Sequence, residues 1–453
     1  MMKVGVRDNL ILLLIGFYLV LNYGFMLVRV PPMTGWGVPF AEIFLLVYGI
    51  FLVRDCRWLP SFSNNIVIFP FLMWWGLGIF HMLYDLPTYG MWAFRDGTHV
   101  IESLFVWVGF VYARTPEAID RLFTWLRVIV SVGCLYAFTY PFGDIVRSIS
   151  PHVTNANGVA TPILGYYTTS TILMLWESTR RFIAREAGTI LIPALLIAYS
   201  VALFQARTTY LQIIALAGTM LWFYRKAFAK LTLALVSGVL VIAAVSVSGI
   251  KIEGRLGEAM TLDFLVRHIE AIGGVESQGL SGAAAGVDQR LGWWDGVYNK
   301  ATENAENLLL GRGYGFPLIS FRVTNDVPVR EPHNSLLSIF ARAGVLGLIA
   351  FACIHVLLFK SWLGAFKLCR QAGYQIGCER LLLFLTYFIL IAVYSLGEDA
   401  YEKPYNTVPY YFLWGVVLHY RIHLIRALAQ PVSAPVPSYG PKPAIVHENP
   451  NPS

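Results

Sequence analysis

The sequence predicts an all-α polytopic membrane protein with about 12 transmembrane helices. Three observations support this class: the composition, the spacing of the apolar stretches and the distribution of basic residues. Of the 453 residues, 57% are hydrophobic and only 13% are charged, about half the charged share of an ordinary soluble domain. A buried core does not require apolar residues in that quantity, so lipid must be the solvent for most of the chain.

Apolar windows long enough to cross the hydrocarbon of a bilayer occur at about twelve places. They cover residues 10–28, 38–53, 65–83, 98–113, 122–139, 158–176, 188–204, 207–224, 231–249, 335–359, 380–396 and 406–422. The first window is too long for a signal-peptide core and lacks a small-residue cleavage site. We therefore interpret it as a retained first span.

Basic residues are concentrated in alternate connectors between these windows, as the positive-inside rule requires of cytoplasmic loops. Such connectors contain Arg54 and Arg57, then Arg180, Arg181 and Arg185, and later Arg225, Lys226 and Lys230. The intervening connectors, such as RVPPMTGWG, are poor in Lys and Arg. The pattern places both termini in the cytoplasm, and it makes the net charge of +7 mainly a signal of topology and not of nucleic-acid binding.

One connector is much longer than the others and divides the chain into four parts. We expect helices 1–9 in residues 1–249, a large external loop with short helices in 250–332, helices 10–12 in 333–426 and a Pro-rich, disordered cytoplasmic tail in 427–453. Within the loop, RLGEAMTLDFLVRHIEAI has an amphipathic pattern and RLGWWDGVYNKATENAENLLLG a helical one, and the Gly/Ala stretch 273–286 is expected to be mobile.

The chain lacks several sequence patterns that define other functional classes. It contains no Walker loop, no G-x-G-x-x-G after a strand and no cysteine spacing typical of a metal site. We also find no internal repeat of the kind that marks many secondary transporters.

The stretch EPHNSLLSIFARAGVLGLIAF, Glu331 to Phe351, begins an apolar helix with polar residues. His333 is either an interface residue beside a helix cap formed by Asn334 or Ser335, or a base able to accept a proton. Arg342 lies nine residues further on, where a charge is costly unless it is paired or functional. The presence of this arginine in the same helix favours a functional role for His333.

Two further arginines are candidates for binding an anion. Arg207 begins the window ARTTYLQIIALAG on the outer side, where the positive-inside rule does not explain it; the alternative is an interface residue that extends toward water. Arg290 stands in DQRLGWWDG and is either a phosphate ligand or a loop residue paired with a nearby aspartate. Beside it, Trp293 and Trp294 suit either the membrane interface or stacking on a sugar.

Other polar groups are predicted on the same outer side, where together they indicate a polar cavity. They are Glu42, Arg95, Asp96, His99 and Glu102. The glycine-rich loop GRGYGF, which includes Gly313, either offers backbone N–H groups to an anion or forms a plain turn.

These residues resemble the bacterial O-antigen ligase and polymerase superfamily. The resemblance rests on HNSLLSIFARAGVLGLIAF, on the arginine that begins a span in ARTTYLQ, on RLGW before the loop helix and on LLLGRGYGF, all in the family's order. These motifs cover roughly residues 200–355, and the first half of the chain matches only in topology.

The resemblance implies glycan transfer at the periplasmic face of the bacterial inner membrane. The donor is then a glycan on undecaprenyl diphosphate, and the acceptor is a sugar hydroxyl, on lipid A-core for a ligase. His333, Arg207 and Arg290 are the implied catalytic residues, while Arg342, Asn334, Trp293, Trp294 and Gly313 are candidates for substrate binding. No metal or cofactor is expected, because the first outer loop, RVPPMTGWG, has no carboxylate of the kind that metal-dependent enzymes with polyprenyl donors carry there.

Three functions remain open from the sequence. A ligase is favoured by the single dominant loop and its Arg290–His333 arrangement. A polymerase, which joins lipid-linked repeat units, is favoured by the Arg-x10-Gly spacing from Arg147 to Gly158. A lipid-linked oligosaccharide transporter ranks third. A transporter would distribute charge through the membrane midplane, whereas this chain has its polar groups on one side.

Overall fold

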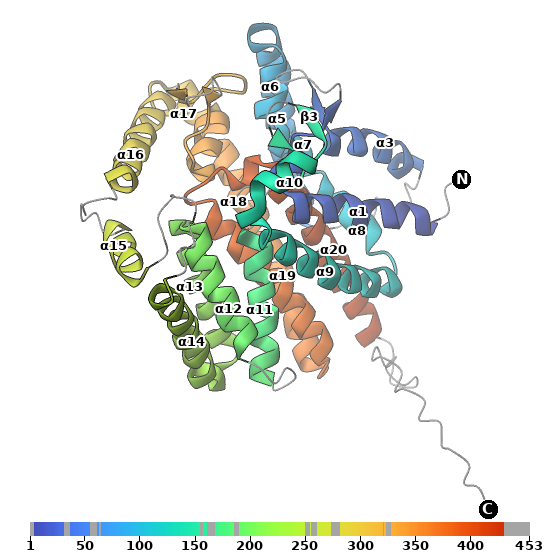
Figure 1. Cartoon of the computed structure of the whole chain (residues 1–453). Helices are drawn as coiled ribbons and strands as arrows, with labels where there is room; N and C mark the ends of the chain where they lie inside the picture. Colours follow the sequence, from blue (N-terminus) through green and yellow to red (C-terminus); the bar gives the residue numbers. More distant parts are fainter. Residues whose placement is uncertain are drawn as a thin grey trace, which may run out of the picture.

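The computed structural model is almost entirely helical (Figure 1). It describes residues 4–30, 37–54, 61–62, 65–154, 157–160, 168–184, 190–249, 254, 261–272, 281–319, 321–322 and 328–429. Most of the predicted tail, residues 430–453, lies outside this range, as does the first part of the Gly/Ala stretch, 273–280.

The first half of the chain consists of helices with short connections. They are α1 (Val4–Leu21), α2 (Tyr23–Met26), α3 (Phe40–Arg54), α5 (Ile68–Tyr89), α6 (Met91–Asp96), α7 (Thr98–Glu102), α8 (Phe105–Tyr112), α9 (Pro116–Ala137), α10 (Gly143–Ile149), α11 (Thr168–Ala184), α12 (Leu191–Phe204), α13 (Arg207–Phe223) and α14 (Phe228–Val247), with 3₁₀ turns at Tyr140–Phe142 and Arg225–Ala227. Their ends follow ordinary capping rules: Thr115, for example, accepts a hydrogen bond from the backbone N–H of Ala118, and Pro116 occupies the first position of α9.

The second half contains the predicted external loop and three long helices. The loop holds α15 (Leu262–Ile272), α16 (Ser281–Ala301) and α17 (Ala305–Leu310), and it is followed by α18 (Ser335–Gln371), α19 (Gln375–Tyr394), the 3₁₀ turn η4 (Ala400–Glu402) and α20 (Pro404–Ala429). Three antiparallel hairpins complete the described fold: β1 (Arg29–Val30) with β2 (Val38–Pro39), β3 (His152–Thr154) with β4 (Asn157–Gly158), and β5 (Phe321–Arg322) with β6 (Pro328–Val329).

The observed helices confirm an all-α membrane protein. The predicted apolar windows overlap helices in the described ranges, with residues 161–167 of the window 158–176 outside those ranges. Helices α14, α18 and α19 are long and apolar enough to cross a membrane. Large apolar side chains are exposed on outer helices, for example Leu46, Phe69 and Leu240, as lipid-facing positions require. The number of twelve spans stays a prediction.

Three details of the sequence prediction need correction. The window 98–113 is divided between α7 and α8, and α18 continues to Gln371, well past the predicted end at residue 359. The later part of the Gly/Ala stretch, from Ser281 onward, belongs to α16. The small residues there are compatible with a helix, since alanine has the highest helix propensity.

Helix α18 is bent at Gly344, directly beside the loop that follows α17. Gly344 has φ 64° and ψ −167°, a conformation that residues with a side chain rarely adopt. A Cβ atom at Gly344 would lie 2.4 Å from the carbonyl carbon of Leu309, and one at Gly311 would lie 2.3 Å from that of Arg342. The two backbone segments therefore pack against each other without side chains between them.

We predict that Gly344→Ala destabilises the protein by about 1–3 kcal/mol from backbone strain alone, and more from the clash with Leu309. Thermal unfolding in detergent, followed by tryptophan fluorescence, measures this as a lower midpoint. Gly76→Ala is the control: Gly76 lies inside α5, and an added Cβ meets nothing within 4 Å. An unchanged midpoint for Gly344→Ala would contradict the role given to this bend.

Candidate functional site

His333 lies immediately before α18 and contacts the loop between α19 and α20. Its Nδ1 atom is 2.9 Å from Oε2 of Glu398 and 3.5 Å from Oδ2 of Asp399. A carboxylate only accepts hydrogen bonds, so Nδ1 carries the hydrogen and, in the neutral ring, Nε2 is left as the acceptor. The side chain is 28% exposed, and Nε2 makes no hydrogen bond to the part of the chain that the structure describes.

The backbone of His333 is held in an uncommon conformation. Its φ of 54° lies in the left-handed region, which non-glycine residues seldom occupy and which is concentrated at functional sites. Two contacts fix the chain on either side. The indole Nε1–H of Trp294 donates to the carbonyl of Pro332 at 2.8 Å, and the Asn334 side chain accepts from the N–H of Leu337 at 3.1 Å, capping α18.

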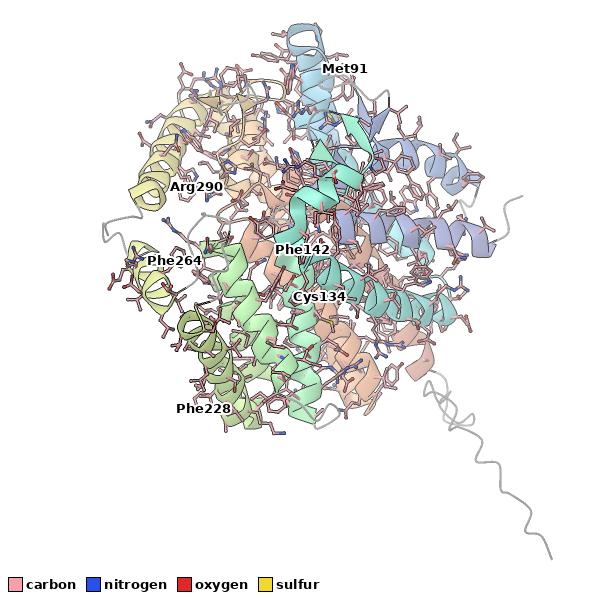
Figure 2. All side chains as sticks on the ribbon, viewed as in Figure 1. Met91, Cys134, Phe142, Phe228, Phe264 and Arg290 are labelled. Atoms are coloured by element: carbon pink, nitrogen blue, oxygen red, sulfur yellow. The ribbon has the colours of Figure 1, made fainter. Side chains whose placement is uncertain are left out.

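Arg290, from α16, reaches the same loop and holds Glu398 in place. Its Nη1 donates to the carbonyl of Gly397 at 2.8 Å, and its Nη2 lies 3.2 Å from Oε1 of Glu398. Figure 2 labels Arg290 on the side of α16 that faces the rest of the molecule. Arg290 and His333 thus bind opposite oxygens of one carboxylate, although 43 residues separate them in the sequence.

The charges around His333 favour its protonated form. Burial lowers the pKa of His333, but the hydrogen bond with Glu398 and the negative charges of Asp399 and Glu398 outweigh burial and the repulsion of Arg290, so the pKa lies above its usual value. Burial also raises the pKa of the Asp399 carboxyl. The site therefore combines a histidine base with a carboxylate that orients it and stabilises its charge.

Arg207 begins α13 and lies close to Arg290. The two guanidinium groups are near enough for their positive charges to repel each other. Thr208, the residue after Arg207, packs on the α19–α20 loop beside Arg290, since a Cβ atom at Gly397 would lie 3.0 Å from Cγ2 of Thr208 and 3.7 Å from Nη1 of Arg290. The structure thus brings the three predicted catalytic residues, Arg207, Arg290 and His333, to one loop.

The two predicted sugar-stacking residues have different surroundings. The ring of Trp293 lies 5.9 Å from that of His333 with a 31° tilt between the planes, so it borders the base. The Trp294 indole is engaged with Pro332. The Asn334 side chain caps α18. The contacts of Trp294 and Asn334 are therefore suited to positioning His333.

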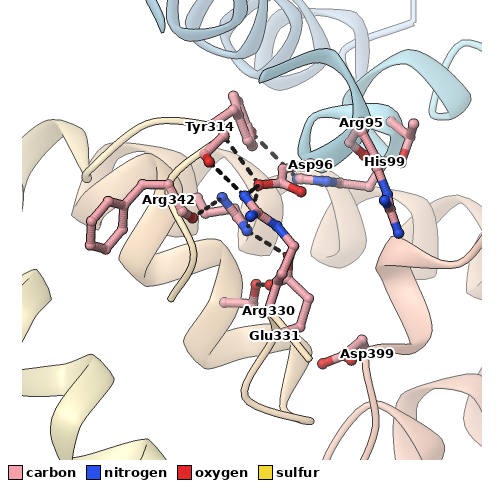
Figure 3. A network of polar contacts seen from close by, with 12 residues as sticks. Arg95, Asp96, His99, Tyr314, Arg330, Glu331, Arg342 and Asp399 are labelled. Carbon is pink, nitrogen blue, oxygen red and sulfur yellow. Dashed lines mark hydrogen bonds and ion pairs between the residues drawn. The ribbon is translucent and has the colours of Figure 1, made fainter. Parts of the chain in front are cut away.

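Arg342 is fully buried and is surrounded by partners within the protein (Figure 3). Its Nη2 lies 2.5 Å from Oε1 of Glu331 and 3.1 Å from Oδ2 of Asp96, and its Nη1 donates to the carbonyls of Gly313 and Phe316. The Arg342 guanidinium has 0% exposure and two carboxylate partners. This geometry fits a structural role for Arg342 and not the binding of a phosphate.

The backbone amides of the loop GRGYGF, residues 311–316, also have partners within the protein. The N–H of Gly313 donates to the carbonyl of Arg342 at 3.0 Å. The next two amides bind carboxylates of this chain: that of Tyr314 donates to Asp85 at 2.6 Å, and that of Gly315 to Asp96 at 3.1 Å. The loop does bind anions, as glycine-rich loops do, but these anions are the protein's own aspartates. Substrate binding by Gly313 stays a prediction, and its own amide is already engaged within the protein.

The five polar residues predicted on the outer side differ in their surroundings, and the cavity itself stays a prediction. Asp96, His99 and Glu102 are buried. Asp96 joins Arg342 to Arg330, and His99 contacts the hydroxyl of Tyr314 at 3.4 Å. Glu42 is half-buried, while Arg95 is exposed. Two of the five, Asp96 and His99, attach α6 and α7 to the loop before α18.

Comparison with known proteins supports the resemblance seen in the sequence. Residues 192–352 match the family model described as O-antigen ligase, and no curated protein matches the chain. The match supports the O-antigen ligase and polymerase superfamily for this part of the chain. The family segment contains Arg207, Arg290, His333 and Arg342, whereas Glu398 and Asp399 follow it along the chain.

Sequence reasoning missed Glu398 and Asp399, which bind the predicted base. Their signal is the stretch GEDAYEK, which places three carboxylates directly after an apolar window. An acidic group at the same predicted membrane boundary as a functional histidine is a candidate partner for it. The motifs of the superfamily lie within residues 200–355 and do not include this loop.

We predict that Asp96→Asn and Arg342→Met each destabilise the protein by about 3–5 kcal/mol, since each removes one partner of a buried charge and leaves only Glu331 to Arg342 or only Arg330 to Asp96. The double variant should lose less than the sum of the two, because it removes both charges. Thermal unfolding in detergent measures all three. Arg312→Gln, which breaks a partly exposed pair with Glu303, is the control and should shift stability by less than about 1 kcal/mol. Normal stability of Arg342→Met, with loss of activity alone, would restore the phosphate role of Arg342.

Proposed function

We propose that this chain is an O-antigen ligase that transfers a glycan from undecaprenyl diphosphate to a sugar hydroxyl of lipid A-core. The proposal takes the active site to face the periplasm and both termini to lie in the cytoplasm. The observation that carries it is the chain of contacts Arg290–Glu398–His333 beside Arg207. It joins a histidine base to two arginines, within the family that the comparison identifies.

In this mechanism His333 activates the acceptor. The acceptor hydroxyl oxygen attacks the anomeric carbon of the donor sugar while its proton moves to Nε2 of His333. The resulting imidazolium is stabilised by Glu398, whose carboxylate lies 2.9 Å from Nδ1. Trp293, beside the imidazole, offers an aromatic face for a sugar ring.

Arg207 and Arg290 act on the other product of the same step. The bond between the anomeric carbon and the diphosphate oxygen breaks, and undecaprenyl diphosphate leaves with the bonding electrons. Guanidinium groups suit phosphate oxygens through their forked donors, and fixed cations stabilise charge that develops on a leaving group. Arg290 uses two of its five N–H groups for Gly397 and Glu398, so three remain for phosphate. Displacement in one step inverts the anomeric configuration.

The surface-glycan profile of a deletion strain tests this function. If the chain is a ligase, full-length glycans accumulate on undecaprenyl diphosphate in the deletion strain and return to lipid A-core on complementation with the wild type. Single repeat units on lipid A-core would instead identify a polymerase, and an unchanged profile would contradict both. Complementation with His333→Ala should give glycan transfer to lipid A-core lower than that of the wild type by a factor of about 100 or more. A normal profile with this variant would remove His333 from the mechanism.

The pH dependence of transfer tests the role of Glu398. The base must be unprotonated, so activity should fall as the pH drops through the raised pKa of His333, above the usual value of about 6.5. Glu398→Gln removes a negative charge that favours the imidazolium. Its acid limb should therefore move to lower pH, and kcat should fall about tenfold.

Purified protein, donor and acceptor provide this measurement as kcat/KM against pH. Glu303→Gln is the matched control, because Glu303 is an exposed carboxylate paired with Arg312 and distant in role from His333. A Glu398→Gln profile that moves to higher pH, or does not move, would refute the proposed His333–Glu398 pair.

A further inference from the structure

A second group of arginines lies on the α6 side of the start of α18. Arg95 and Arg330 both stack on the indole of Trp92, with their Cζ atoms 4.4 Å and 4.2 Å from the ring centroid. Arg330 is also paired with Asp96 at 2.9 Å. Stacking on a tryptophan holds a guanidinium in a fixed position without neutralising its charge.

Arg95 differs from Arg330 in lacking a carboxylate partner. Within the described ranges, no carboxylate lies within ion-pair distance of Arg95, and its side chain is exposed at the surface. Although much of the residue is exposed, burial around its guanidinium and the positive charge of Arg29 lower the pKa of Arg95 to about 10, which still leaves it charged at neutral pH.

Arg29 adds a second guanidinium to this group. It stands on β1, which leads through β2 into α3, and α3 packs on α7 directly after α6. Its Nε atom is buried and has no hydrogen-bond partner among the residues that the structure describes. The charges of Glu42 near Arg29 and of Asp96 near Arg95 offset this pair in part, but no carboxylate in the described part of the chain forms an ion pair with either arginine. The two positive charges repel each other, so the arrangement favours binding of an anion from outside the chain.

This group lies near the segment that precedes His333, since Glu331 is near enough to Arg95 for their charges to attract, and it is separate from Arg207 and Arg290. Helix α7, which follows Arg95, packs on η4, and η4 follows Glu398 and Asp399 directly. In Figure 3 the Arg95 side chain points away from the buried network, on the side where Asp399 lies. Helices α16 and α6 lie on different sides of the start of α18 in Figure 1. Positive groups therefore flank the histidine on two sides.

We propose that Arg95, stacked on Trp92 and assisted by Arg29, binds a phosphate group of the acceptor. This inference rests on the proposed function. In a displacement with inversion the acceptor approaches opposite the leaving group, so its binding groups are expected on the side of His333 away from Arg207 and Arg290. A phosphate dianion matches two guanidinium groups in charge and accepts their forked N–H donors.

Transfer kinetics with purified full-length protein in phosphatidylcholine nanodiscs test this proposal. The acceptor is used as the phosphorylated glycolipid and after enzymatic removal of its phosphates. For the phosphorylated acceptor, Arg95→Gln should raise KM about tenfold or more, while kcat and the KM of the donor stay within about twofold. Removing the acceptor phosphate should raise the wild-type KM to the same level, and Arg95→Gln should then have no further effect.

Arg312→Gln is the matched control, because Arg312 also stacks on an aromatic ring, Phe316 at 4.6 Å, but is paired with Glu303. Equal effects of Arg95→Gln on both acceptor forms would overturn phosphate recognition. An effect that appears only when phosphatidylglycerol is added to the nanodiscs would assign Arg95 to a lipid headgroup and overturn the acceptor site. A wild type inactive with every acceptor would contradict the proposed function itself, whereas an active wild type with an unaffected Arg95→Gln contradicts only this inference.

Discussion

The buried positive charge of Arg342 is the constraint on which the arrangement of the site depends. A guanidinium with 0% exposure is tolerated in a helix predicted to cross the membrane only if carboxylates and carbonyls surround it. Its partners come from three places: Asp96 at the end of α6, Glu331 just before α18 and the carbonyls of the loop 311–316. Satisfying one charge therefore fixes three segments relative to one another, and His333 lies two residues after Glu331.

A second set of contacts fixes His333 from the opposite direction. The hydroxyl of Ser335, in the first turn of α18, donates to the carbonyl of Glu398 and accepts from the N–H of Tyr401. The α19–α20 loop is thereby attached to α18 by its backbone, while its Glu398 side chain binds both Arg290 and His333. The left-handed backbone of His333 is held between these two anchored segments. Local backbone strain persists where the surrounding contacts fix the chain in this way.

The sequence predicted the helices well because hydrophobic length is a local property that each window carries by itself. Contacts that join distant segments were less accessible. Arg342 was recognised as costly, yet nothing local indicates that Asp96 is its partner. The same applies to Glu398, which is 65 residues from His333. The loop 311–316 shows the limit most clearly: its glycines left either an anion site or a plain turn open, and only the fold shows that two of its amides bind Asp85 and Asp96.

Arginines in this chain therefore have roles that sequence position alone does not separate. Arg342 and Arg330 form ion pairs with carboxylates and connect segments of the fold. Arg290 uses some of its N–H groups to bind Glu398 and leaves others without a partner within the described segments. Arg95 stacks on an aromatic ring, which does not neutralise its charge. Loss of activity in an arginine variant is consequently not evidence of phosphate binding. A variant of Arg342 releases Glu331 and with it the segment that carries His333, so the base is displaced although no ligand contact is lost. Stability and kinetics must be measured on the same variant before any of these arginines is assigned to a substrate, because replacing a buried arginine such as Arg342 disturbs the segment that carries His333 even where no substrate contact exists.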